Sequence, residues 1–429
     1  GVKEGDFTMI YGFPGNTQEY ILSDAVAYIA ERSDPAKIAI RTGRLDIISA
    51  AQESDPALRI HYAAKHASIA NAWKKWQGEA LGIGRLGTVA SKRAYEQEFA
   101  AWAQDKPEYR SVVADLKAEY ARIADAYFAR EITRETLGAL PERYTPEERA
   151  EAAFARREQT ERALFEWLFG QYARRCPVQY QIPAFLAGVA ASGSPEAYAG
   201  EVFDTLWREG ADTTAVHALH KDTERMLGHI GWMLETKSLR NLNSGRLNEL
   251  YTTYIKGLRE WDTLRAFYPD ANLTLRVAYG KVGGYQYADG VYHKPYTTVE
   301  GILEKDNPEI YDYNIPQRLR DIIAAKDYGR WGVEIDGRTT VPVCFLADNH
   351  TTGGNFRQGK DLFHQKKKGP FAHAAHLRGD TLHRSATGDK SVVSLLPFAL
   401  GVVADAVLIP LASVLVLLQL SGGLSILFL

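Results

Sequence analysis

This chain contains few methionines and cysteines and carries almost no net charge. Its 429 residues include three methionines and two cysteines, and the formal charge is −2. This near-neutral balance gives no argument for a nucleic-acid partner or for an anionic membrane surface. Cys176 and Cys344 could form one disulfide or remain two buried thiols, so they do not decide the compartment. Tyrosine (23) and tryptophan (8) are plentiful instead, which favours a core and grooves built from rigid aromatic side chains.

The first residues also lack an initiator methionine and a basic segment followed by an apolar one. We therefore expect any signal peptide to lie upstream of Gly1. Residues 5–13 alternate like a strand that already belongs to a sheet. The pattern predicts a chain that begins within a domain.

After a turn at residues 14–17 the sequence becomes helical for about 250 positions. Capping residues followed by proline predict helix starts: Asp34-Pro35, Asp55-Pro56, Thr145-Pro146 and Ser194-Pro195. Apolar residues at helical spacing predict buried faces, as in Val112, Leu116, Tyr120, Ile123 and Tyr127. Charged runs such as Arg156, Arg157, Glu158 and Glu161 are interpreted as solvated faces.

Strands and turns return from about residue 270. Strands are predicted at 273–280 and 341–346, and Asp336-Gly337 predicts a hairpin turn. The fold class is therefore α+β, with β-sheet sequence (1–16 and 271–355) interrupted by a helical domain (17–270).

The composition changes abruptly at Phe356. Residues 356–429 contain no Glu, Trp or Tyr, and they include an apolar run over 391–420. This run is long enough to span a bilayer, but Asp405 in its middle would be costly there. Contact with a membrane is expected only if this run is genuine.

Two short patterns are more simply explained by structure than by function. Residues 82–87 match the three-glycine dinucleotide pattern but follow a helical segment, so we interpret them as an interhelical loop. His217, His220 and Glu224 could face one side of a helix and offer two imidazoles and a carboxylate to a metal. Their spacing is not that of a zinc protease, and a third clear ligand beside the two histidines is lacking, so we interpret the histidines as structural. No metal and no cofactor are expected.

Asn71 stands in an unusual segment, residues 68–76, in which small residues precede Trp73 and Trp76. The residues alone favour a core helix with a buried, hydrogen-bonded amide. The amide oxygen could instead accept a hydrogen bond from a ligand amine.

Residues 348–355 carry the strongest pattern. Chymotrypsin-like proteases need a glycine two residues before the nucleophile, because its N–H and that of the nucleophile point at the developing oxyanion. Gly354 holds that place relative to position 356, but position 356 is Phe.

Five blocks, at residues 5–20, 44–47, 67–76, 289–298 and 351–355, closely resemble the bacterial dipeptidyl-peptidase 7 and 11 family. The resemblance implies a chymotrypsin-like double β-barrel interrupted by a helical cap, which releases dipeptides from peptides with a free N-terminus. It implies a periplasmic or cell-surface location and a homodimer. It assigns one oxyanion donor to Gly354 and binding of the substrate's α-amino group to Asn71.

The departures from the family matter for activity. The family's catalytic His and Asp precede the block that matches residues 5–20, and neither is in this chain. After Gly-Gly-Asn the family continues Ser-Gly, whereas Phe356-Arg357 follows here. One inserted nucleotide would convert Asn-Ser-Gly to Asn-Phe-Arg, so we hypothesise that residues 356–429 are translated out of frame. We therefore expect an inactive member of a serine-type dipeptidyl-peptidase family, or alternatively a non-catalytic peptide-binding or membrane-tethered protein.

Overall fold

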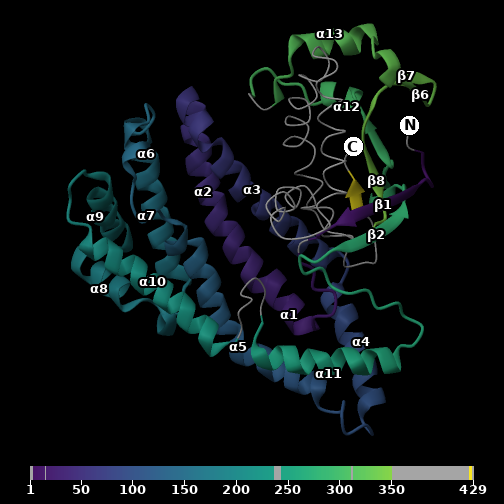
Figure 1. The fold of residues 1–429 in the computed structure, drawn as a ribbon, viewed down its shortest axis with the longest axis horizontal. Coiled ribbons are helices and arrows are strands. Elements are labelled where there is room, and N and C mark those ends of the chain that lie inside the picture. The colour runs from purple at the N-terminus through teal and green to yellow at the C-terminus, as the bar shows by residue number, and fades with distance from the viewer. Residues whose placement is uncertain (1–2, 15, 236–242, 311–312, 350–424, 428–429) are drawn as a thin grey trace, which may run out of the picture. The chain divides into compact units, whose positions relative to one another are not determined.

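The computed structural model describes residues 3–14, 16–235, 243–310, 313–349 and 425–427. The chain forms two compact units (Figure 1). One is helical and comprises Tyr20–Phe267, and the other contains the strands and comprises Gly1–Glu19 with Tyr268–Leu429. The sequence placed these divisions three residues away on each side, at 16/17 and 270/271.

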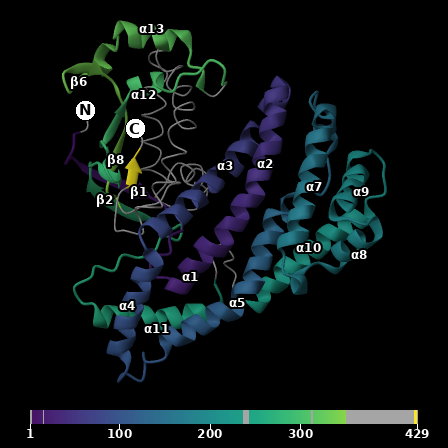
Figure 2. The ribbon, with the colours of Figure 1, turned by 180° about the vertical axis from the view of Figure 1, so that it is seen from behind.

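The helical unit is built from long helices joined by short connections. Its helices are α1 (Ser23–Tyr28), α2 (Asp34–Ser54), α3 (Pro56–Arg85), α4 (Thr88–Ala103), α5 (Val112–Glu135), α6 (Pro146–Ala150), α7 (Glu158–Arg175), α8 (Pro183–Ser192), α9 (Pro195–Trp207), α10 (Thr214–Met233) and α11 (Gly245–Trp261). A π-helical turn, Ile29–Ser33, joins α1 to α2. Helix α2 lies between α3 and α7 (Figures 1 and 2).

Helix α5 contributes heavily to the main hydrophobic core. The apolar series predicted from the sequence is confirmed, because all five of its residues are buried in this core: Val112, Leu116, Tyr120, Ile123 and Tyr127. Rings from α7, α8 and α9 pack into the same core, with Phe165 edge-on to Phe203. Many of the chain's aromatic side chains therefore lie in the core of the helical unit.

Three of the four predicted helix starts are confirmed. Asp55 accepts a hydrogen bond from Ala57 N at 2.7 Å, Ser194 accepts one from Ala197 N at 3.0 Å, and Thr145 forms a capping box with Glu148. The fourth is correct in position only: α2 begins at Asp34 with proline in its first turn, but the chain before Asp34 is already helical and the Asp34 side chain caps nothing.

Two further predictions for the helical unit need correction. Arg157 and Glu161 are 3% and 4% exposed, so they do not belong to a solvated face. The three-glycine pattern is less of a loop than predicted, because α3 continues to Arg85 and only Leu86 and Gly87 separate it from α4. The pattern directly follows helical residues of α3 and not a strand, so it lacks the context of a dinucleotide site.

The second unit contains short antiparallel sheets. Strand β1 (Phe7–Gly12) pairs with β2 (Arg276–Lys281), β3 (Tyr285–Ala288) with β4 (Val291–His293), and β6 (Val333–Ile335) with β7 (Arg338–Thr340). A fourth strand pair, β5 (Tyr296–Thr298) with β8 (Pro342–Ala347), is extended by β9 (Ser425–Leu427). The same unit holds helices α12 (Glu300–Leu303) and α13 (Gln317–Ala325).

The local predictions for this unit mostly hold. Asp336 and Gly337 form the turn between β6 and β7 with φ of 49° and 72°, the left-handed conformation that a two-residue hairpin needs. The predicted strand at 273–280 begins too early, since Leu273 has φ of 66° and β2 starts at Arg276. Cys176 and Cys344 are free, buried thiols, so the disulfide alternative is wrong.

Within the described ranges, no helix has both the length and the apolar character that crossing a bilayer requires. The apolar run at 391–420 lies outside those ranges.

Candidate functional site

The backbone that leads to the predicted nucleophile position is anchored by Asp348 and Asn349, directly after β8. Asn349 is fully buried. Its Oδ1 accepts a hydrogen bond from Thr8 Oγ1 at 2.6 Å, and its Nδ2 donates to Ala278 O at 3.2 Å. A single amide therefore links the end of β8 to both β1 and β2.

Asp348, one residue earlier, links the end of β8 to β2 alone. Its Oδ1 accepts a hydrogen bond from Lys281 N at 2.5 Å, and its own N–H donates to Lys281 O at 3.0 Å. Gly280 makes the approach possible, because a Cβ there would lie 2.2 Å from Asp348 Oδ1 and 2.8 Å from Asn349 N. We refer to Asp348, Asn349 and their partners on β1 and β2 as the polar clamp.

The polar clamp fixes the last described residues before the oxyanion motif. Preorganised N–H donors are what stabilise an oxyanion, so a rigid approach to Gly354 suits that purpose. Gly354 and Phe356 themselves lie outside the described residues, and their assignments stay predictions. Sequence reasoning grouped Asp348 and Asn349 with the motif but missed their role; the available signal was two polar residues immediately after a buried strand.

Asn71 lies in the middle of α3 and is exposed, so the expectation of a buried amide is wrong. Its neighbours Ile69 and Ala70 are buried and pack on the core formed by α2, α3 and α7. The assignment of Asn71 to a substrate amine stays a prediction.

The helix behind Asn71 is held firmly. Trp73 Nε1 donates a hydrogen bond to Thr42 Oγ1 at 2.9 Å. Arg41 donates twice to Glu135, at 2.8 and 2.9 Å, and once to Ile69 O at 3.0 Å. Because Arg41 joins α2, α3 and α5 in this way, Asn71 projects from a rigid support.

A buried charged group adjoins this support. Asp34 is 1% exposed, and its carboxylate lies 3.0 Å from Lys37 Nζ. Lys37 also pairs with Glu131 at 3.3 Å and lies over the Trp76 ring. Burial raises the pKa of Asp34 to about 7, although Lys37 acts in the opposite direction. The Lys37 pKa is lowered by burial but raised more by Glu131 and Asp34, so its net shift is upward.

The histidine pair on α10 does not form a metal centre in the described part of the chain. His217 is exposed and His220 is half-buried, with its pKa lowered mainly by burial. Across the described ranges, no group of three His, Cys, Asp or Glu side chains could hold a metal ion.

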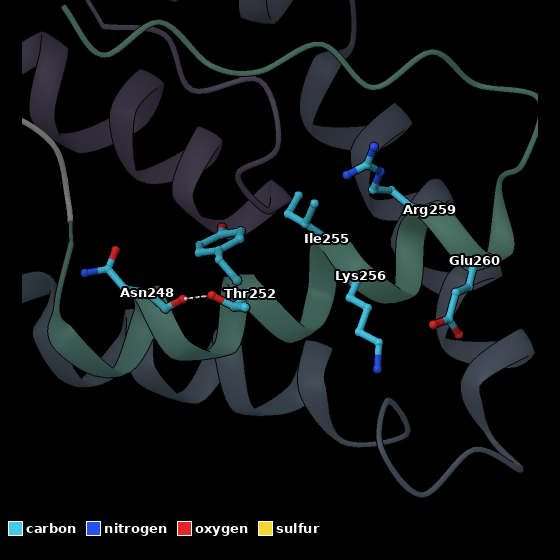
Figure 3. Close-up of a pocket in the computed structure, with 7 residues that line it drawn as sticks. Asn248, Thr252, Ile255, Lys256, Arg259 and Glu260 are labelled. Atoms are coloured by element: carbon cyan, nitrogen blue, oxygen red, sulfur yellow. Dashed lines mark hydrogen bonds between the residues drawn. The ribbon is translucent and has the colours of Figure 1, made fainter. Parts of the chain in front are cut away.

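A cavity of about 590 Å³ follows one face of α11 (Figure 3). Two of its charged residues already have partners, since Lys256 pairs with Glu108 at 2.7 Å and Glu260 accepts a hydrogen bond from Tyr109 at 2.8 Å. Arg259 projects to a different side of the helix from Lys256 (Figure 3). The cavity therefore offers few unsatisfied groups to a ligand.

Comparison with known proteins identifies the family. The sequence model of Peptidase S46 matches residues 1–164 and 157–359. An Asp/Glu-specific dipeptidyl-peptidase of Capnocytophaga gingivalis is 32% identical over 397 residues, which cover 83% of this chain and 55% of that protein. A dipeptidyl-peptidase 7 of Phocaeicola vulgatus is 28% identical, with 83% of this chain and 54% of that protein covered.

A solved structure agrees with these sequence matches. The crystal structure of Porphyromonas endodontalis DPP11 in complex with the dipeptide Arg-Glu matches with a TM-score of 0.69 at 27% identity, covering 82% of this chain and 56% of that chain. The chain thus spans about half the length of the relatives it matches. The family match ends at residue 359, which leaves 360–429 outside it. The chain belongs to the Peptidase S46 family.

Proposed function

We propose that this chain represents part of a serine-type dipeptidyl-peptidase, in which the strand-containing unit belongs to a chymotrypsin-like double β-barrel and the helical unit is the cap. The family match over residues 1–359 supports this proposal. In an intact member the serine would attack the second peptide bond, His would act as general base and Asp would orient it. Gly354 would donate one hydrogen bond to the oxyanion, and Asn71 would accept one from the α-amino group of the peptide.

The chain with the printed sequence is proposed to be inactive. The observation that carries this is Phe356, which follows Gly353-Gly354-Asn355 at the nucleophile position. A phenyl ring offers no oxygen or sulfur to attack a carbonyl carbon.

The test is release of a fluorescent amine from dipeptidyl-naphthylamide substrates that carry acidic or hydrophobic residues before the scissile bond. We expect no turnover above the buffer rate. Turnover by the printed chain that a serine-directed phosphonate inhibits would contradict the proposal. Sequencing the gene across codon 356 tests the frameshift separately, and an alternative frame that contains no nearby Ser-Gly would exclude it.

A second candidate function is binding of peptides without cleavage. The exposed position of Asn71 on a rigid helix supports it. We expect saturable binding of a labelled peptide with a free N-terminus, no binding of the N-acetylated peptide, and loss of binding in Asn71→Ala. Gln77→Ala, which removes another exposed amide from α3, is the matched control. Equal binding of the acetylated peptide would rule out this role. Periplasmic or cell-surface location and homodimerisation stay proposals that rest on the resemblance.

A further inference from the structure

A second cavity in the helical unit is lined by three arginines. It has a volume of about 340 Å³ and lies between the loop that precedes α6 and the loop that joins α9 to α10. Arg143 and Arg149 come from the first side, and Arg208 comes from the second. We refer to this cavity as the arginine pocket. Its volume is within the range of small-molecule sites.

One wall of the arginine pocket is rigid. Arg149 donates hydrogen bonds to the carbonyl oxygens of Leu206 and Trp207, both at 2.6 Å. These carbonyls belong to the last turn of α9, so the guanidinium satisfies acceptors that a helix end leaves open. The buried Tyr144 ring packs edge-on against Trp207, with centroids 5.2 Å apart. The two loops are therefore held together before any ligand arrives.

Most charged side chains that line the pocket are arginines, and two of the three arginine side chains have no hydrogen-bond or ion-pair partner among the described residues. Arg143 and Arg208 are exposed, and neither guanidinium forms a hydrogen bond or an ion pair with another described residue. Glu209 is the one carboxylate in the lining, against three guanidiniums. Asp212 is not in the lining, and its Oδ1 accepts hydrogen bonds from Thr214 N and Oγ1 at 2.9 and 2.6 Å.

The beginning of a long helix also lies at the pocket, with its first N–H donating to Asp212. Thr213 lines the pocket, and α10 runs for 20 residues from Thr214. The N-terminal end of such a helix carries a partial positive charge. Guanidiniums from two loops and a helix start thus surround one small cavity, and arginine binds phosphate groups through paired N–H donors.

We propose that the arginine pocket binds a small oxyanion of the phosphate type, either free or as the phosphate group of a metabolite. The open guanidiniums of Arg143 and Arg208, which come from two separate loops, suit the several oxygens of a tetrahedral anion better than the two oxygens of a carboxylate. This site is independent of peptide cleavage, because it uses neither Asn71 nor the segment that approaches Gly354.

Isothermal titration of the full chain with inorganic phosphate, at constant ionic strength set with sodium chloride, tests the proposal. Constant ionic strength is needed because salt screens exposed arginines. We expect saturable binding that weakens at least tenfold in Arg143→Gln/Arg208→Gln. We expect Glu209→Gln to tighten binding severalfold, because it removes the opposing carboxylate. Arg149 is left intact, since it holds the end of α9.

Arg93→Gln/Arg110→Gln is the matched control, because both residues are exposed arginines of the same unit outside the pocket. It should bind phosphate as tightly as the parent chain. Glutamate and a sugar phosphate, titrated in the same way, separate a carboxylate from a phosphate ligand and free phosphate from a metabolite. Absence of saturable binding, equal weakening in the control, or tighter binding of glutamate than of phosphate would overturn the proposal. A thermal melt of each variant confirms that a loss of binding is not a loss of folding.

Discussion

Replacing Asp34 with asparagine should stabilise the helical unit at alkaline pH much more than in acid. The Asp34 carboxylate is 1% exposed, and its oxygens receive no hydrogen bond of good geometry, although Lys37 Nζ lies 3.0 Å away. Burial therefore raises its pKa from 3.8 to about 7. The folded chain holds this proton more tightly than the unfolded chain. The contribution of Asp34 to stability is thus complete below about pH 4 and is lost as the pH rises through 7.

The size of the stability change follows from the pKa shift of Asp34. Each pKa unit corresponds to about 1.4 kcal/mol, so a shift of roughly three units costs the folded state about 4 kcal/mol once Asp34 is fully ionised. About 2.5 kcal/mol of this loss falls between about pH 5 and pH 8.5. Asparagine has nearly the same shape and cannot ionise. The stability advantage of Asp34→Asn should therefore grow by that amount across this pH range.

Thermal unfolding followed by far-ultraviolet circular dichroism measures the difference. For a unit of this size the gap in Tm between variant and parent should widen by about 5–10 °C from the acidic to the alkaline condition. Asp105→Asn, which removes an exposed carboxylate from the same unit, is the control. A gap that stays constant or narrows at alkaline pH would refute the reasoning. Carbon-13 NMR titration of the Asp34 carboxyl carbon measures the pKa directly.

Three further substitutions test other contacts. Asn349→Ala breaks the polar clamp and leaves Thr8 Oγ1 without its acceptor, so it should destabilise the strand-containing unit by about 1–3 kcal/mol; faster hydrogen exchange of the β1 and β2 amides would show it. Ser194→Ala removes the cap of α9 and should cost about 1 kcal/mol in thermal or urea unfolding, whereas an unchanged midpoint would exclude the cap's contribution. The pKa of His61 is lowered by burial and by Arg157, so stability should fall as the pH drops below about 6.5. His61→Gln should flatten that decline, and an unaltered pH profile would assign it to other groups.

Patterns that depend on a few adjacent residues predicted their structure well. Asp336-Gly337 forms its turn because two left-handed residues fit a tight hairpin wherever it lies. Asp34-Pro35 and Asp55-Pro56 look alike in sequence, yet only Asp55 is extended and caps the helix that follows it, since α1 and the π-helical turn run straight into Asp34. Whether a residue is the first of a helix depends on the chain before it, which this dipeptide does not specify.

Burial and long-range pairing were harder to predict. Arg157 and Glu161 are charged, as residues on a solvated helix face usually are, but both are buried. Asn71 shows the opposite error. Its small and aromatic neighbours suggested that it is buried, but it lies on the exposed face of its helix. In the candidate site, Asn349 was visible as a polar residue after a strand. Its partner Thr8 lies 341 residues earlier, and no local pattern connects them.

The pairing of β1 with β2 also constrains how the protein emerges from the ribosome. Phe7 is opposite Lys281 in the register, so β1 cannot pair with β2 until the whole helical unit has been translated. At ordinary rates of synthesis this interval is on the order of ten to fifty seconds. During it, β1 would present an unpaired edge with two apolar side chains, Phe7 and Met9, which remain more than half exposed in the folded chain. A nascent chain stalled within α5 should therefore engage chaperones through β1, and one stalled well beyond Lys281 should not.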